Sequence, residues 1–288
     1  MDAACTIQRG ESGWLPRLTA IPEPPERLRV RGVLGPAGER RVAIVGMRHP
    51  DAYGLDLTRE IARDLARAGV CVVSGGAEGI DGAAHAAALE AGGRTVAVLG
   101  TGLDVVYPAG HRELFARIVN AGGALISEYE DDQRGERWTF PKRNRIVSGM
   151  SEAVLVVRAG ERSGALITAG WARRQGVPVF ALPGDVRLEG SAGPTALLRQ
   201  GAKVAASARD LLEALGMAGQ LELPVTEAPA VGGDEAALLG ALGRVPRHAD
   251  EVARTAGLTP AAALSALLLL ELRGLCEQRP GHLFLRRG

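Results

Sequence analysis

The chain has 288 residues and a mass of 30.0 kDa, a size that predicts one large domain or a large domain with a small one. Its 39 glycines follow no collagen period and 46% of the residues are apolar, which excludes both collagen and a disordered chain. Aromatic residues reach only 3%, which argues against an aromatic-rich all-β or carbohydrate-binding module. The formal net charge is +1, so any anion site must be local.

The cysteines and the apolar runs indicate the compartment. Cys5, Cys71 and Cys276 are far apart and show no CxxC spacing, which favours reduced thiols over a disulfide framework or a zinc site. The first residues lack the apolar stretch of a signal peptide, and the apolar run at 261–270 is too short to cross a bilayer. We therefore expect a cytoplasmic protein without a membrane segment.

The first 40 residues are rich in Pro, Gly and Arg and show weak periodicity, which predicts an irregular arm packed on the next domain. From residue 41, short β-type apolar runs alternate with helical patterns. We expect strands at 42–45, 70–73, 95–99, 124–126, 153–157, 177–181 and 203–205, and helices at 57–65, 83–91, 112–120, 165–175 and 208–215. This alternation predicts an α/β fold over residues 41–215, an extended Rossmann-like, doubly wound parallel sheet.

A second, smaller domain is expected at residues 234–288, after a Gly- and Pro-rich linker at 216–233. Helical patterns at 236–242, 249–256 and 260–272 precede two short strands, 275–278 and 282–285, around a turn at 279–281. This order predicts a winged-helix domain. Its third helix contains no Arg, Lys, Asn or Gln, which favours packing or partner contact over sequence-specific DNA reading.

Glycine-rich or hydroxyl-bearing loops follow most of the expected strands. They include the segments 46–48, 74–81, 100–102, 163–168 and 183–185. One such loop is explained more simply as a turn, but a doubly wound sheet brings the carboxyl ends of its strands to one edge. Loop N–H groups and helix N-termini at that edge favour a phosphate ligand.

The segment RGERWTFPKRNR, residues 134–145, carries five basic side chains with Trp138 and Phe140 between them. Cations that hold a backbone and rings that stack bases are typical of single-stranded nucleic-acid sites. The alternative is a solvated charge run beside the acidic residues 128–132.

Known catalytic patterns are missing from the sequence. It contains no GxSxG and no GxxxxGK[ST], and the first strand is followed by GMRHPDAYG instead of GxGxxG. Asp81 and His85 have the spacing to share a metal, but no third ligand is evident, so we expect Asp81 to cap a helix. The sequence therefore predicts no catalytic residue, no metal and no cofactor.

A series of motifs occurs in one order along the chain: VAIVGMR, SGGAEGID, AVLGTGLDVVYPAGHREL, LISEY, FPKRNRIVSGMS, SGALITAGWA, PVFALPGD and GPTALLRQGA. Together they resemble the DNA processing protein A family (DprA, also called Smf) from about residue 15 to 287. Met47, His111 and Arg158 stand where that family more often has Ser, Asn and Glu.

The resemblance implies a cytoplasmic protein that binds and protects single-stranded DNA, loads RecA recombinase onto it during natural transformation, and forms homodimers through the Rossmann-like domain. It implies phosphate contacts from Arg48, Lys142, Arg143 and Arg145. The expected DNA-binding residues are Gly46, Met47, Arg48, Ser74, Gly75, Gly76, Phe140, Lys142, Arg143, Asn144, Arg145, Ser163, Gly164, Thr168, Pro183 and Gly184.

Two other functions remain open at this point. The fold also resembles the LOG-type phosphoribohydrolases, which cleave nucleoside monophosphates and need a PGGxGTxxE loop. The comparable segment here, SGALITAGW, lacks that glutamate. The other alternative is a RecA-binding scaffold with incidental DNA affinity, against which the basic, aromatic segment 134–145 argues.

Overall fold

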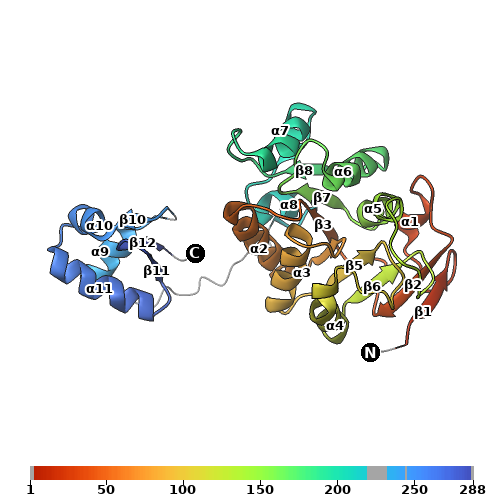
Figure 1. Ribbon diagram of the computed structural model, residues 1–288, viewed down its shortest axis with the longest axis horizontal. Helices are drawn as coiled ribbons and strands as arrows, with labels where there is room; N and C mark the ends of the chain where they lie inside the picture. The colour runs from red at the N-terminus through yellow and green to blue at the C-terminus, as the bar shows by residue number, and fades with distance from the viewer. Residues whose placement is uncertain (1–2, 219–231, 244, 287–288) are drawn as a thin grey trace. The chain divides into compact units, whose positions relative to one another are not determined.

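A computed structural model describes residues 3–218, 232–243 and 245–286. It divides the chain into two compact units, Met1–Leu221 and Glu222–Gly288 (Figure 1). Of the expected linker, only residues 216–218 and 232–233 are among the described residues. The expected fold class, a doubly wound, mostly parallel sheet with a small C-terminal winged-helix domain, is confirmed.

The larger unit is built on one sheet with the strand order β1-β2-β6-β5-β4-β3-β7-β8-β9. Seven strands are parallel: β3 (Arg41–Val45), β4 (Cys71–Ser74), β5 (Thr95–Leu99), β6 (Ala124–Ser127), β7 (Ala153–Val156), β8 (Val179–Ala181) and β9 (Lys203–Val204). The chain moves outward from β3 to β6 and then returns to place β7 on the other side of β3. This reversal is the switch point at which doubly wound sheets form a ligand crevice.

The N-terminal arm differs from the irregular segment that the sequence predicted. It forms β1 (Cys5–Gln8), the short helix α1 (Pro16–Thr19) and β2 (Arg27–Gly32). β2 pairs antiparallel with β6 and β1 pairs with β2, so the arm extends the sheet beyond β6. Arg29 on β2 forms an ion pair with Asp131, which ties the arm to the acidic loop after β6.

Helices cover both faces of the sheet (Figure 1). One face packs against α1, α5 (Thr139–Gly149), α6 (Gly164–Arg174) and α7 (Ala192–Arg199). The other packs against α2 (Ala52–Arg67), α3 (Ile80–Glu90), α4 (Arg112–Asn120) and α8 (Ala208–Ala214). Successive β3 residues alternate between the two cores, as in Val42 and Ala43, because side chains alternate along a strand. Buried on both faces, the strands read as unbroken apolar runs.

The smaller unit contains α9 (Asp234–Ala241), α10 (Ala249–Ala256) and α11 (Pro260–Leu272) beside a sheet of the order β10-β12-β11. Its strands are β10 (Arg247–His248), β11 (Cys276–Arg279) and β12 (Leu283–Arg286). Leu238, Leu267 and Phe284 lie at the centre of its core. Other leucines of α11 are exposed, Leu268 and Leu272 among them, so this helix presents an apolar face.

Within the described residues, no single helix is long and apolar enough to cross a membrane. The helices α10 and α11 meet the length and composition criteria only as a pair bent by 105°. Both helices contribute side chains to the core of the smaller unit.

The larger unit contains a buried ion cluster formed by Glu39, Arg41 and Arg94. Glu39 lies 2.9 Å from Nη2 of the buried Arg41 and 2.7 Å from Nε of Arg94. We expect Glu39→Gln to lower the free energy of unfolding by about 3 kcal/mol, because it leaves the Arg41 charge buried without a counter-ion. Urea unfolding followed by Trp fluorescence measures this, since Trp14, Trp138 and Trp171 all lie in the larger unit.

The control for that prediction is Glu130→Gln. Glu130 pairs with Arg27, but its side chain is 60% exposed, and exposed pairs contribute at most about 1 kcal/mol. Equal losses of stability in the two variants would contradict the assignment of the Glu39 cluster as a buried structural interaction.

Candidate functional site

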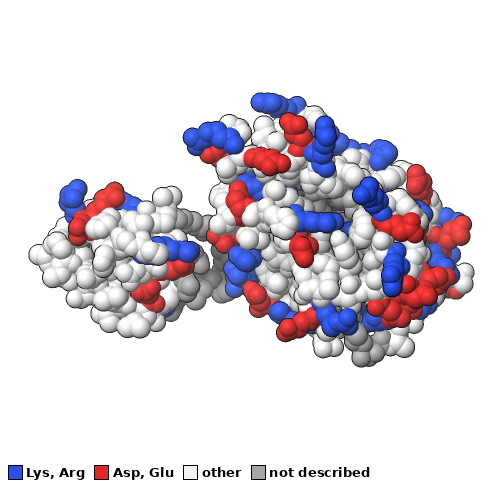
Figure 2. All heavy atoms as spheres, viewed as in Figure 1, with Lys and Arg blue, Asp and Glu red and all other residues white. Residues whose placement is uncertain are grey.

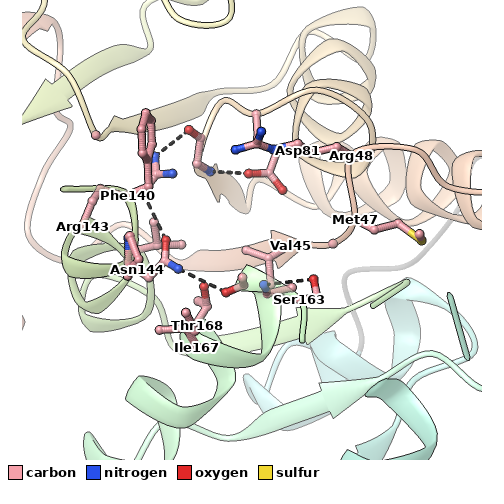
Figure 3. A pocket seen from close by; sticks show the side chains of 18 of the residues that line it. Val45, Met47, Arg48, Asp81, Phe140, Arg143, Asn144, Ser163, Ile167 and Thr168 are labelled. Carbon is pink, nitrogen blue, oxygen red and sulfur yellow. Dashed lines mark hydrogen bonds between the residues drawn. The ribbon is translucent and has the colours of Figure 1, made fainter. Parts of the chain in front are cut away.

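A cavity of about 1400 Å³ lies at the carboxyl edge of the parallel strands (Figure 3). The loops after β3, β4, β5, β6, β7 and β8 all contribute to its walls, together with the first turns of α5 and α6. Arg48 and Asp81 lie on one side of the cavity, and Asn144 and Thr168 lie across from them. The expected convergence of the loops is therefore what the structure shows.

Arg143 forms part of the cavity floor, although it is almost completely buried. Its Nη1 donates hydrogen bonds to the carbonyl oxygens of Gly75, at 2.5 Å, and Val98. Burial lowers the pKa of Arg143 to about 10, and the charge of Asp81 opposes this shift. Arg143 therefore joins α5 to the loop after β4 and to strand β5.

Asp81 supports the same loop from the opposite side. Its carboxylate accepts a hydrogen bond of 3.1 Å from the backbone N–H of Gly75. Burial raises the pKa of Asp81, while the nearby Arg143 charge and the hydrogen bonds to the carboxylate act in the opposite direction. The expected helix-capping role is wrong: the N-cap of α3 is Gly79, with no side-chain cap, and Asp81 lies within the first turn.

His85 does not share a ligand with Asp81. Its Nδ1 lies 2.6 Å from the hydroxyl of Thr95, and burial lowers the pKa of His85 to about 3. Among the described residues, no group of three or more His, Cys, Asp or Glu side chains is arranged to hold a metal.

The loop that carries Arg48 packs against the start of α3. Gly79, at φ +77°, has no room for a side chain, because a Cβ there would lie 2.4 Å from the carbonyl oxygen of Arg48 and 2.5 Å from that of Met47. The N–H of Ile80 donates to the same Met47 carbonyl at 3.3 Å. These backbone contacts fix the position from which the Arg48 side chain extends.

Four exposed guanidinium groups surround the cavity without a hydrogen-bond or ion-pair partner among the described residues. They belong to Arg48, Arg134, Arg137 and Arg162. Acidic side chains also reach the wall, including Glu136 and Glu161. Figure 2 shows basic and acidic side chains intermixed on this face of the larger unit, which agrees with the near-zero net charge. The positive potential of the cavity is therefore local.

The N-terminus of α6 forms the opposite wall. The Ser163 hydroxyl accepts a hydrogen bond of 3.3 Å from the N–H of Ala165, as an N-cap does. The Asn144 amide donates to the Gly164 carbonyl at 3.2 Å and so links α5 to α6. Thr168, one turn further along, also lines the cavity. This helix end adds partial positive charge to the wall.

Aromatic and apolar side chains complete the cavity. Phe140 packs against Gly100, and its ring lies 5.3 Å from that of Tyr107, centroid to centroid. Tyr107 and Ile167 are partly exposed at the cavity wall. The cavity thus offers cations, helix-end N–H groups and apolar surface within one space.

The structure brings most of the expected site residues to this cavity. Those that line it are Gly46, Met47, Arg48, Gly75, Gly76, Phe140, Arg143, Asn144, Ser163, Gly164 and Thr168. Met47 contributes to the wall, but its sulfur lies close to Gly190, where an added Cβ would be 3.0 Å away. Its N–H donates to the Arg158 carbonyl at 2.7 Å.

Five expected residues do not line the cavity: Ser74, Lys142, Arg145, Pro183 and Gly184. The buried Ser74 hydroxyl donates to the Ile44 carbonyl at 2.6 Å. Arg145 is also buried. It donates to the Glu23 carbonyl at 2.7 Å and forms an ion pair with Glu128, so its guanidinium is used inside the protein. Lys142 lies on the outer side of α5, with its Nζ 3.7 Å from Glu128.

Sequence reasoning missed several cavity residues that carry exposed functional groups, among them Arg162 and Tyr107. Arg162 precedes the N-cap of α6, and its position directly before the SGALITAGW segment was a usable signal. Tyr107 belongs to the segment after β5, five residues beyond the glycine-rich stretch 100–102 from which the site was predicted.

Comparison with known proteins identifies similar chains. The family model described as DNA recombination-mediator protein A matches residues 6–216, and the model described as DprA winged helix domain matches residues 222–282. The DNA processing protein DprA of Mycobacterium tuberculosis is 45% identical over 259 residues, which cover 86% of this chain. The chain spans 66% of that relative's length, just under two thirds. Protein Smf of Escherichia coli is 40% identical over 280 residues, covering 94% of this chain and 75% of the relative.

Solved structures agree with these matches. DNA processing protein A of Streptococcus pneumoniae is similar with a TM-score of 0.68 and 36% identity, over 73% of each chain. DNA processing protein A of Helicobacter pylori, described for its single-stranded DNA binding mode, is similar with a TM-score of 0.65 and 29% identity. That match covers 74% of this chain and 95% of the other.

The packing around Gly75 predicts a specific sensitivity. A Cβ at this position would lie 2.7 Å from both Arg143 Nη2 and Asp81 Oδ2. We expect Gly75→Ala to force the two buried groups apart and to lower the free energy of unfolding by about 1–3 kcal/mol. Urea unfolding measures the loss.

Gly164→Ala is the matched control, because Gly164 lines the same cavity but a Cβ there meets nothing within 4 Å. Its stability should stay the same or rise slightly, since alanine favours a helix more than glycine does. A Gly75→Ala variant as stable as the control would show that the floor tolerates displacement.

Proposed function

Because the chain belongs to the DNA recombination-mediator protein A family, we propose that it binds single-stranded DNA, with the strand's phosphates at the cavity rim. The proposal depends on one observation: several exposed guanidinium groups surround one cavity and have no partner in the part of the chain that the structure describes. Guanidinium groups bind phosphate oxygens through paired N–H donors, and the α6 N-terminus supplies further N–H groups and positive potential.

The apolar part of the cavity favours a single strand over a duplex. The side chains of Phe140, Tyr107 and Ile167 offer apolar surface on which the bases of a single strand can pack. The bases of a duplex are paired and stacked on each other, so they cannot reach this surface. The Helicobacter pylori relative, studied for its single-stranded DNA binding mode, supports the same ligand class.

We propose binding without chemical turnover. Two of the carboxylates at the cavity are engaged within the protein: Asp81 accepts a hydrogen bond from Gly75, and Glu136 accepts one from the Trp138 indole. Glu161 and Glu189 also line the cavity, and both lie outside the α6 segment. Glu78 is exposed and does not line the cavity. Phosphoribohydrolase chemistry needs a carboxylate free to act at the glycosidic bond, and the α6 segment supplies none.

The proposal extends to the biological role that family membership suggests. It includes delivery of bound DNA to RecA recombinase during DNA uptake or recombination, homodimers through the larger unit, and a cytoplasmic location. The relatives named as DNA processing proteins support this role. RecA filament formation on single-stranded DNA, measured with and without the protein, tests the RecA part, and sedimentation tests the dimer.

The Arg48 side chain gives the sharpest test of DNA binding. We expect Arg48→Ala to weaken binding to single-stranded oligonucleotides and to reduce the slope of log K against log [salt] by about 0.7, the value for one lost phosphate contact. Fluorescence anisotropy over a range of salt concentrations measures both quantities. Arg59→Ala is the control, because Arg59 pairs with Asp56 on α2 and does not line the cavity. Identical slopes for the two variants would remove Arg48 from the site.

The absence of turnover is tested separately. We expect no release of free base from AMP or CMP above background, because the SGALITAGW segment lacks the glutamate that phosphoribohydrolases place at the glycosidic bond. Chromatography of the reaction mixture measures base release. Release that disappears in Glu161→Gln, which removes an exposed carboxylate at the cavity wall, would favour the phosphoribohydrolase alternative.

A further inference from the structure

Trp138 is an exposed aromatic side chain just outside the cavity. It directly precedes α5 and is 50% exposed. Its neighbour Arg137 lines the cavity, whereas Trp138 and Lys142, one helical turn further on, do not. The exposed surface around Trp138 and Lys142 is therefore directly adjacent to the cavity wall at Arg137.

The indole ring is held in place from within the protein. Its Nε1 donates a hydrogen bond of 2.7 Å to the carboxylate of Glu136. The ring stands nearly perpendicular to the buried ring of Tyr129, with centroids 5.9 Å apart and planes at 82°. An indole fixed by its nitrogen and by an aromatic neighbour, in a residue that is half exposed, is a preorganised stacking surface.

The charges around the ring favour a phosphate beside a stacked base. Lys142 Nζ lies 5.8 Å from the centre of the indole ring, and its side chain is partly exposed. Glu128, 3.7 Å from Lys142, is also paired with Arg145, so its charge is shared between two cations. Glu136 is bound to the indole N–H, and the guanidinium of Arg137 is exposed.

Trp171 on α6 is less exposed than Trp138. The guanidinium of Arg174 lies only 3.8 Å from the centre of its ring and covers one face. Trp171 does not line the cavity either. The two tryptophans thus form a natural pair of test and control positions.

We propose that Trp138 and Lys142 form a second subsite, at which one base of a single strand leaving the cavity past Arg137 stacks on the indole. The adjacent phosphate then contacts Lys142. This inference rests on the proposed function and extends the DNA footprint beyond the cavity. Indole stacking accepts any base, so the subsite is expected to add affinity without sequence preference.

The first test compares Trp138→Ala with Trp171→Ala on oligothymidylates of two lengths. An oligonucleotide of about 4 nucleotides can be held by the cavity alone, whereas one of about 12 nucleotides can reach the outer surface as well. We expect Trp138→Ala to weaken binding of the longer oligonucleotide roughly 5- to 100-fold, the range for one lost base stack. Binding of the shorter one, and both affinities of Trp171→Ala, should match the wild type.

The second test reads the ring directly. Replacing Trp14 and Trp171 by Phe leaves Trp138 as the sole indole, because the chain has three tryptophans. Its fluorescence should be quenched by the longer oligonucleotide at the same concentrations that give binding by anisotropy. A protein that retains Trp171 alone should show no quenching. If the double variant does not fold, the wild-type quenching minus that of Trp138→Phe gives the same quantity.

The outcomes separate this inference from the proposed function. If the wild type binds neither oligonucleotide, the proposed function fails and the subsite with it. If the wild type binds and depends on Arg48, while Trp138→Ala binds the longer oligonucleotide like Trp171→Ala and the sole Trp138 is not quenched, only the subsite is overturned.

Discussion

The cavity depends on the interactions that the buried guanidinium group of Arg143 makes with its neighbours. A cation removed from water must be compensated by partners at close range. Arg143 finds them in the carbonyl oxygens of Gly75 and Val98 and in the charge of Asp81. Because these groups belong to α5, to the loop after β4, to β5 and to α3, their arrangement cannot change at one element alone. The contacts of Arg143 therefore fix the positions of these cavity walls relative to one another.

Arginine serves two opposite purposes in the larger unit, and burial separates them. Arg41, Arg145 and Arg158 are buried and bound to protein oxygens, with Arg158 also 4.7 Å from the ring of Tyr53. None of these three guanidinium groups lines the cavity. Arg48 and Arg162 lack such partners among the described residues and face the cavity. The residue type alone thus does not identify a phosphate contact. A phosphate contact also requires that the guanidinium N–H donors are exposed and are not already bonded to protein oxygens.

This distinction explains how far the sequence could predict the structure. The central strands were predictable because burial on both faces leaves apolar runs such as residues 95–99. The strand β2 was not, since arginines alternate along it and take ion-pair partners on the loop after β6. Helix α5 was hidden by its basic residues, which resemble a solvated run, although Arg143 and Arg145 are buried. Charge in a sequence does not show which tertiary partners a side chain will find.

The mixed charge of the cavity limits where a strand can lie. Each phosphate contact with a single strand contributes about −0.7 to the salt slope, so four cations could give a slope of about −3. The acidic neighbours Glu136 and Glu161 oppose placement of phosphates elsewhere along the wall. A protein with a net charge of +1 cannot attract DNA by a broad field. Its affinity must therefore arise from phosphates at particular guanidinium groups and from bases on particular apolar surfaces. A duplex satisfies the first requirement only, and this difference is the physical basis of a preference for single strands.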